Sequence, residues 1–177
     1  MKALKKQLYI LLALCGLALL FFVLLFVSDY RAQEAAAASG EIVFSCNPGL
    51  VTELQIVTEK ESFAFVHDTG NDSWTFADTG EAANALRLAQ MLAELREIRS
   101  DTVTGAVTDL APYGLDTPSV KISFSYGDAS HTLEIGNYST AAHRYYARAE
   151  GENRVFLIST SVKTAFDVTE AELRAAE

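Results

Sequence analysis

The sequence predicts an α+β protein, in which a single N-terminal transmembrane helix precedes an antiparallel-sheet domain made of two strand-then-helix halves. Three observations lead to this prediction. Residues 8–27 form an uncharged apolar run. Short segments in which apolar and polar residues alternate are followed by a helical pattern at residues 84–98. The same order of strands and then helix returns after residue 118.

The apolar run, LYILLALCGLALLFFVLLFV, is long enough to cross a membrane. A helix of this length spans about 30 Å, the thickness of a bilayer core. Lysines lie before the run within residues 1–7, and positive residues favour the cytoplasmic side of a membrane. We therefore expect a cytoplasmic N-terminus at 1–7, a linker at 28–40, and a domain outside the cell membrane at 41–177.

Two other interpretations of the N-terminus remain open. Ala35 and Ala37 form an A-x-A-like pattern that is typical of a signal-peptide cleavage site, although the apolar part of a signal peptide is only about 7–15 residues long. Cys15 could carry a lipid, although Leu14 is bulkier than the small residue that normally precedes a lipidated cysteine. An uncleaved membrane anchor is the preferred interpretation.

The part of the chain that follows the apolar run is strongly acidic. Of the 14 Lys and Arg residues four precede residue 32, and of the 23 Asp and Glu residues only Asp29 does. Residues 32–177 therefore have ten basic and 22 acidic side chains, a formal net charge of −12. Such a charge repels nucleic acid and anionic headgroups, so we expect no nucleic-acid partner. Proteins, cations and neutral sugars remain, and solubility alone also explains the charge.

The first half of the domain contains three predicted strands and one helix. Alternating patterns predict strands at 51–58, 62–67 and 73–77. Asp78 or Thr79, with Glu81, resembles the N-terminal cap of the helix that follows. Apolar residues three and four apart predict one buried stripe on the helix at 84–98: Leu88, Met91, Leu92, Leu95 and Ile98.

The second half repeats this order. Its predicted strands are 119–126, 131–136, 145–149 and 154–159, and a helical segment begins at residue 161. A last short helix is expected after Thr169, because Thr169 and Glu172 fit a capping box and Val168 and Leu173 fit its hydrophobic staple.

The stretch DLAPYGLDTPS, residues 109–119, is predicted to be a structural joint between the two halves. Each proline disfavours a helical conformation at the residue before it, and glycine can take a positive φ. Asp109 and Asp116 are expected to close turns through their side-chain oxygens. An active-site loop is the alternative. The predicted joint consists of Pro112, Tyr113, Gly114, Leu115, Asp116 and Pro118.

The segments SWTFAD, DLAPYGLDTPSVKISF, HTLEIGN, RYYARAEG and RVFLIS resemble, in order and spacing, the domain of unknown function called DUF4340. The resemblance covers about residues 42 to 175, and the YGL-D-x-P stretch is its most specific part. It implies a membrane-anchored component of the cell envelope, whose relatives are often encoded beside ABC exporters of the gliding-motility type. No catalytic residues are established for the family, so none are implied here.

The sequence has no motif that predicts catalysis or a cofactor. It lacks a phosphate-binding G-x-x-x-x-G-K-[ST] loop, an H-E-x-x-H pair and a G-x-S-x-G turn. We therefore expect a protein that is not an enzyme and binds neither metal nor cofactor. Two weaker alternatives stay open, a metal site formed by His67, Asp68 and His131 with other acidic residues, and a hydrolase. The hydrolase would use Asp128, Ser130 and His131, or Asp109, Asp116 or His131.

The best candidate for partner binding lies in the segment RYYARA and just before it. Tyrosine and arginine contribute disproportionately to protein interfaces. If Tyr145 is buried, strand alternation places Arg144, Tyr146 and Arg148 on the opposite face, where a partner can reach them. The alternative is that this alternation only separates core from solvent. The predicted partner-binding residues are Tyr138, Arg144, Tyr146 and Arg148.

Taken together, the sequence predicts a single-pass membrane protein that acts as a non-enzymatic accessory or scaffold subunit of an ABC-type transport system. The expected partners are the bilayer, through residues 8–27, and the permease or ATPase subunits of the transporter. The alternative function is a free-standing module outside the membrane that binds a glycan or a peptide. Cys46 is either buried or available to a partner chain.

Overall fold

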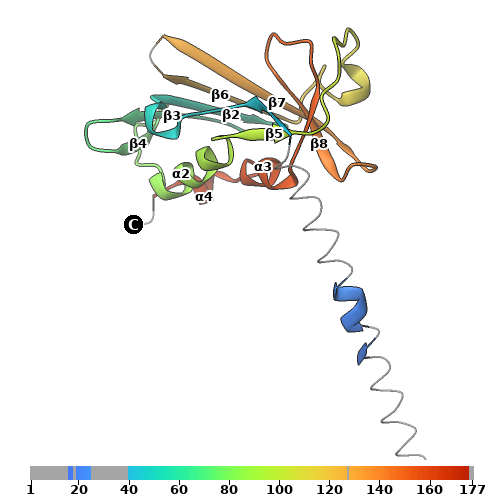
Figure 1. Cartoon of the computed structure of the whole chain (residues 1–177). Helices are drawn as coiled ribbons and strands as arrows, with labels where there is room; N and C mark the ends of the chain where they lie inside the picture. The colour runs from blue at the N-terminus through green and yellow to red at the C-terminus, as the bar shows by residue number, and fades with distance from the viewer. Residues whose placement is uncertain (1–15, 18, 25–39, 127, 176–177) are drawn as a thin grey trace, which may run out of the picture. The chain divides into compact units, whose positions relative to one another are not determined.

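The computed structural model describes residues 16–17, 19–24, 40–126 and 128–175 (Figure 1). The chain divides into two compact units, Met1–Ala36 and Ala37–Glu177. In the first unit, residues 16–17 and 19–24 are α-helical and exposed. The remainder of the predicted span at 8–27, the N-terminus at 1–7 and the linker residues 28–39 lie outside the described residues. No helix in the described part of the chain is both long and apolar enough to cross a membrane.

The second unit contains a seven-stranded antiparallel sheet with the order β4-β3-β2-β6-β7-β8-β9. The first half of the domain provides β4, β3 and β2, the second half provides the other four strands, and the pairing of β2 with β6 joins the halves. The prediction of a mixed α+β fold with antiparallel strands is confirmed. The strands are β2 (Glu53–Thr58), β3 (Ser62–Asp68), β4 (Ser73–Phe76), β6 (Val120–Tyr126), β7 (Ala129–Ser139), β8 (Arg144–Ala149) and β9 (Phe156–Ile158).

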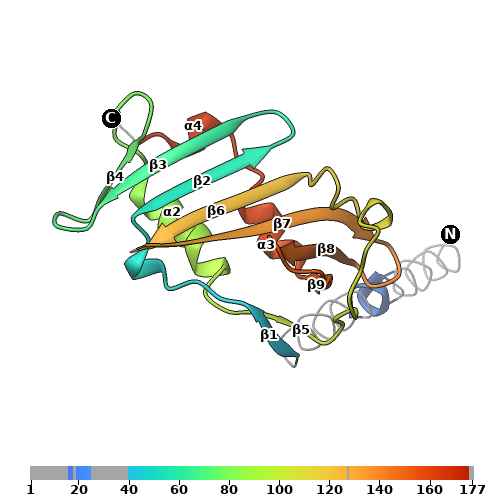
Figure 2. The ribbon, with the colours of Figure 1, turned by 90° about the horizontal axis from the view of Figure 1, so that it is seen from above.

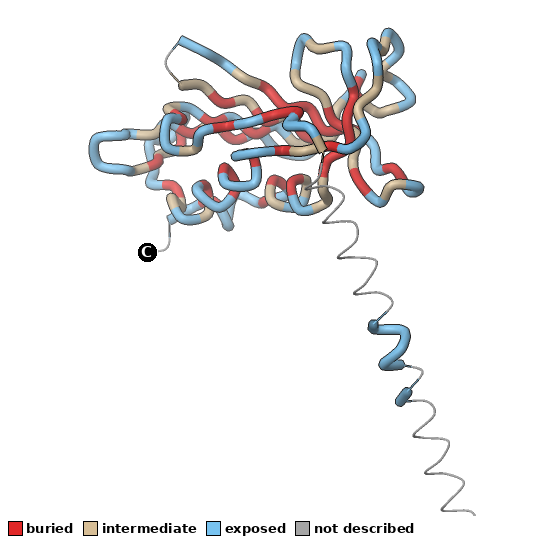
Figure 3. The backbone as a smooth tube through the Cα atoms, viewed as in Figure 1, coloured by how far each residue is buried: buried red, intermediate tan, exposed pale blue. Residues whose placement is uncertain are grey.

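Three helices cover one face of this sheet, as Figure 1 shows. They are α2 (Ala85–Glu94), α3 (Thr160–Ala165) and α4 (Glu170–Leu173). The core lies between the helices and the sheet, where Figure 3 shows the buried residues along both layers. The capping box that the sequence predicts at the start of α4 is present between Thr169 and Glu172.

The predicted helix at 84–98 is shorter in the structure, and its cap is a different residue. Helix α2 ends at Glu94, and the chain then forms β5 (Ile98–Ser100), which pairs with β1 (Glu41–Phe44) in a separate two-stranded sheet. The prediction of Asp78 or Thr79 as the cap was wrong. Asn84 caps the helix by accepting a hydrogen bond of 3.1 Å from the backbone N–H of Arg87.

The opposite face of the sheet is open over β3, β2 and β6, and Figure 2 looks onto it with α2 and α3 behind the strands. Alternation along β2 explains the two faces, because Leu54 and Ile56 are buried while Glu53, Gln55 and Val57 are exposed.

Segments of the same chain run along both edges of the seven-stranded sheet. Residues 81–83 run beside β4, where the backbone N–H of Ala83 donates to Trp74 O over 2.8 Å. Residues 102–104 run beside β9, where the backbone N–H of Thr104 donates to Val155 O over 2.8 Å. Two short 3-10 helices, η1 (Pro48–Leu50) and η2 (Ala111–Tyr113), complete the described elements.

Candidate docking surface

The open face of the sheet contains a shallow trough of about 330 Å³ that crosses β3, β2, β6 and β7. The small side chains of Ala64 and Ser123, which flank Gln55 in one cross-strand row that continues to Thr132, leave room for it. The neighbouring row contains Val66, Glu53, Ser125 and Ser130.

Hydroxyl groups make most of the polar contacts in this trough. The Ser125 hydroxyl donates to Glu53 Oε2 over 2.9 Å, and the hydroxyls of Ser123 and Thr132 lie 3.0 Å apart. The trough thus offers hydroxyls, one carboxylate and one amide beside the apolar surface of Val66. These groups can donate and accept hydrogen bonds with a polar ligand or with polar groups of a protein partner.

A row of alternating charges borders the trough on the side of β8. Glu134 on β7 lies between Lys121 Nζ at 3.3 Å and Arg148 Nε at 2.6 Å, and its side chain is only 6% exposed. Glu150 extends the row, because its carboxylate lies 2.6 Å from Lys121 Nζ. Hydrogen bonding to Glu150 raises the pKa of Lys121, and the same bond lowers the pKa of Glu150. Arg148, one of the predicted partner-binding residues, is therefore part of an internal ion-pair network.

The predicted joint lies against β7 and β8. The helix η2 brings the ring of Tyr113 into edge contact with the ring of Tyr146, with 5.0 Å between the centroids. Gly114 ends η2 in the left-handed conformation, with φ 67°. Leu115 is buried, and Asp109 accepts a hydrogen bond from the backbone N–H of Ala111 over 3.1 Å. The predicted joint, through Tyr113, is therefore in contact with Tyr146, which is one of the predicted partner-binding residues.

Arg144 and Tyr138 have different surroundings at the end of the β7–β8 hairpin. Arg144 is 8% exposed and holds both carboxylate oxygens of Asp101, at 2.6 and 3.3 Å. Hydrogen bonding from Arg144 lowers the pKa of Asp101. Tyr138 is 42% exposed, and its hydroxyl lies 3.2 Å from Nδ1 of His143. Of the four predicted partner-binding residues, Tyr138 is the one whose side chain stands at the surface.

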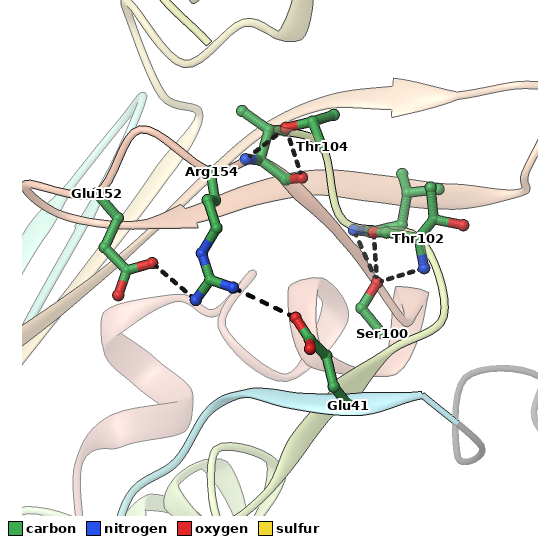
Figure 4. Close-up of polar contacts among 8 residues, drawn as sticks. Glu41, Ser100, Thr102, Thr104, Glu152 and Arg154 are labelled. Atoms are coloured by element: carbon green, nitrogen blue, oxygen red, sulfur yellow. Dashed lines mark hydrogen bonds and ion pairs between the residues drawn. The ribbon is translucent and has the colours of Figure 1, made fainter. Parts of the chain in front are cut away.

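A second group of polar contacts fastens β1 to the rest of the domain, as Figure 4 shows. Arg154 lies between Glu41 and Glu152, at 3.3 Å from each carboxylate. Nearby, the Ser100 hydroxyl donates to Thr102 O over 2.8 Å and accepts from the backbone N–H of Leu157 over 3.3 Å. These bonds attach β1 and the strand β5 to the edge at β9.

The histidines and acids considered for chemistry lie apart. Within the described ranges, no group of three His, Cys, Asp or Glu side chains is placed to hold a metal ion. The Asp68 carboxylate accepts a hydrogen bond from the backbone N–H of Gly70 over 2.9 Å, and the ring of His131 stacks on Phe124. Ser130 pairs with Ser125 on the open face and His131 with Phe124 on the core face. The two neighbours therefore do not form a nucleophile and its base.

Comparison with known proteins identifies the domain but no characterised relative. A family model described as "Domain of unknown function (DUF4340)" matches residues 43–177, which is nearly all of the second unit. No curated protein and no solved structure matches the chain.

Proposed function

Because the chain belongs to the DUF4340 family, we propose that it is a non-enzymatic accessory subunit of an ABC-type transport system. In this proposal, residues 8–27 anchor the chain in the cell membrane, and the domain at 41–177 lies on the outer side of that membrane. The domain contacts the permease of the transporter. One basis of the proposal is that members of the family resemble membrane-anchored envelope components, and that relatives are often encoded beside ABC exporters.

The observation that carries the proposal is the uncovered face of the sheet. The helices cover the opposite face, where Leu54 and Ile56 are buried, whereas Gln55, Val57 and Val66 remain exposed on this one. Ala64 and Ser123 in the central row are small, so a partner can approach the strands closely there.

Site-specific crosslinking in native membranes tests this proposal. A photo-reactive amino acid is placed at Gln55 or Val66, both of which point away from the core. The proposal predicts a crosslinked product that contains a permease subunit, identified by mass spectrometry after purification in mild detergent.

Leu86 provides the matched control, because it is exposed on α2, on the covered side of the sheet. The same reactive group at Leu86 should give little of this product. If no transporter subunit is recovered from either position on the open face, the domain does not dock there and the proposal fails.

The trough favours a second candidate function, a module that binds a glycan or a peptide. Its hydroxyls and its single amide suit a neutral, polar ligand. This candidate predicts that the isolated unit from residue 37 onward binds a glycan or peptide without the anchor. Replacing Ser123 with a large residue such as Tyr should then abolish binding. The accessory-subunit proposal predicts no such binding by the isolated unit.

A further inference from the structure

The ring of His67 on β3 is held on three sides. Its Nδ1 lies 2.8 Å from the backbone oxygen of Val51, and its Nε2 lies 3.0 Å from Oδ1 of Asp72. One face of the ring stacks on the indole of Trp74, with centroids 4.4 Å apart and an angle of 3° between the planes. The side chain of His67 is 7% exposed and that of Asp72 is 93% exposed.

Both neighbours of the ring nitrogens are hydrogen-bond acceptors. A backbone oxygen only accepts, so Nδ1 must carry a proton for the contact with Val51 to be a hydrogen bond. An exposed carboxylate is ionised near neutral pH and also only accepts, so Nε2 must carry a proton as well. The two contacts exist together only when His67 is an imidazolium cation, and the stacked indole favours that cation further.

We propose that His67 is a proton-dependent latch that fastens the β3–β4 turn to Val51, two residues before β2. With two protons, His67 bonds Val51 and Asp72 at the same time. With one proton, the bond to Val51 keeps the hydrogen on Nδ1, and the lone pair of Nε2 then faces the carboxylate of Asp72. The turn at 69–72 loses its link to the core in that state.

The backbone of the turn gives the latch a mechanical effect. Asp72 has a φ of 54°, a backbone conformation that residues other than glycine rarely adopt. The bond to His67 helps to hold it there, so loss of the proton allows the turn to relax. Asp72 is the charged group in contact with the ring. The other acids nearby have different partners, because Asp68 accepts from Gly70 N and Glu53 accepts from Ser125.

The chain contains a single tryptophan, and that residue is the one beneath the latch. A protonated imidazole stacked on an indole quenches its fluorescence, because the cation accepts an electron from the excited ring. The experiment follows the emission of Trp74 in the full-length protein, in detergent micelles, from about pH 5 to about pH 9, the range in which histidines change charge. The latch predicts an increase in emission in one step as the pH rises.

Three variants separate the latch from other titrations. His67→Gln should abolish the step, whereas His131→Gln and His143→Gln should keep it. Asp72→Asn should shift the step to lower pH, because a neutral amide stabilises the imidazolium less than a carboxylate does.

A flat emission profile in the unmodified chain overturns the proposal, as does a step that survives His67→Gln. If His67→Gln does not fold, Asp72→Asn decides, because the side chain at position 72 is almost fully exposed and its replacement does not disturb the core. An unchanged step in Asp72→Asn then rejects the latch.

Discussion

At the scale of single residues, Gly114 illustrates how closely the joint packs against Asn137 on β7. Its φ of 67° disfavours any side chain, and an added Cβ would lie 2.5 Å from the side chain of Asn137. Gly114→Val should therefore lower the free energy of unfolding by about 1–2 kcal/mol, through backbone strain and displacement of Asn137. Chemical denaturation of the purified protein measures this change.

Gly105→Val is the matched control for this substitution. Gly105 lies in the connection between β5 and η2, has no atom within 4 Å of an added Cβ, and does not have a positive φ. Its replacement should leave the free energy of unfolding nearly unchanged. Equal stability of the two variants would contradict the fit of Gly114 against Asn137.

Cys46 is a second residue whose surroundings predict its behaviour. It is 4% exposed, and burial raises the pKa of its thiol to about 11. Only the thiolate reacts with alkylating reagents, so Cys46 should resist maleimide in the native protein at neutral pH and react after denaturation. Mass spectrometry of a Cys15→Ser variant checks this, since Cys46 is then the only thiol. Rapid labelling of the native protein would show that the site is open.

At the scale of secondary-structure elements, the pair of Asp101 and Arg144 links the end of β5 to β8. Asp101→Asn should lower the free energy of unfolding by about 1–3 kcal/mol at neutral pH, because it leaves a buried arginine without its charged partner. Arg144 lowers the pKa of Asp101 in the folded state. The pair therefore stabilises the fold above the ordinary range of a carboxyl group and ceases to do so as the pH falls through the lowered value.

Denaturation at several pH values tests this prediction. The difference in unfolding free energy between the unmodified protein and Asp101→Asn should be largest near neutral pH and should shrink on acidification. A difference that stays constant down to about pH 2 would show that the charge of Asp101 does not contribute, since the carboxyl group of the unfolded chain is then protonated and the stabilisation must have decreased.

The elements that the sequence predicted well are strands in which apolar and polar residues alternate. Alternation of apolar and polar residues found β2, β3, β4 and β6 to within two residues at each end. The strand β5 was assigned to a helix, because Ile98 continues the apolar spacing of α2 although its backbone pairs with β1. Its pairing with a strand more than fifty residues earlier is a tertiary effect that no local pattern shows.

The candidate surface was less predictable than the fold. Arg144, Tyr146 and Arg148 were selected from their residue types. A residue type does not show whether the side chain already contacts a partner inside the domain. Their partners inside the domain are Asp101, Tyr113 and Glu134, which lie 43, 33 and 14 positions away in the chain. The serines of the trough carry no such signal, and only the register of β2, β6 and β7 aligns them.

At the scale of the whole domain, the two halves depend on each other. The strand β2 pairs with β3 on one side and with β6 on the other, and α3 and α4 from the second half pack beside α2. A fragment that ends at residue 110 leaves β2 with an unpaired edge and a core without its second half. We expect this fragment to be unfolded by circular dichroism.

The unit at residues 37–177 should unfold in one transition. Emission from Trp74 reports on the first half, and circular dichroism reports on both halves, so their midpoints should coincide in a denaturant titration. Two separated midpoints would show that the halves fold independently despite the shared sheet.

The residues that run along the edges of the sheet have a further consequence. Exposed strand edges are templates on which other chains assemble into fibres. Here residues 81–83 occupy the edge of β4 and residues 102–104 occupy that of β9. These two segments cover backbone groups at the outer strands that would otherwise be open to a neighbouring molecule. A partner that approaches the open face therefore meets side chains and not the outer strand edges, and substitutions on that face can change specificity while the strands stay paired.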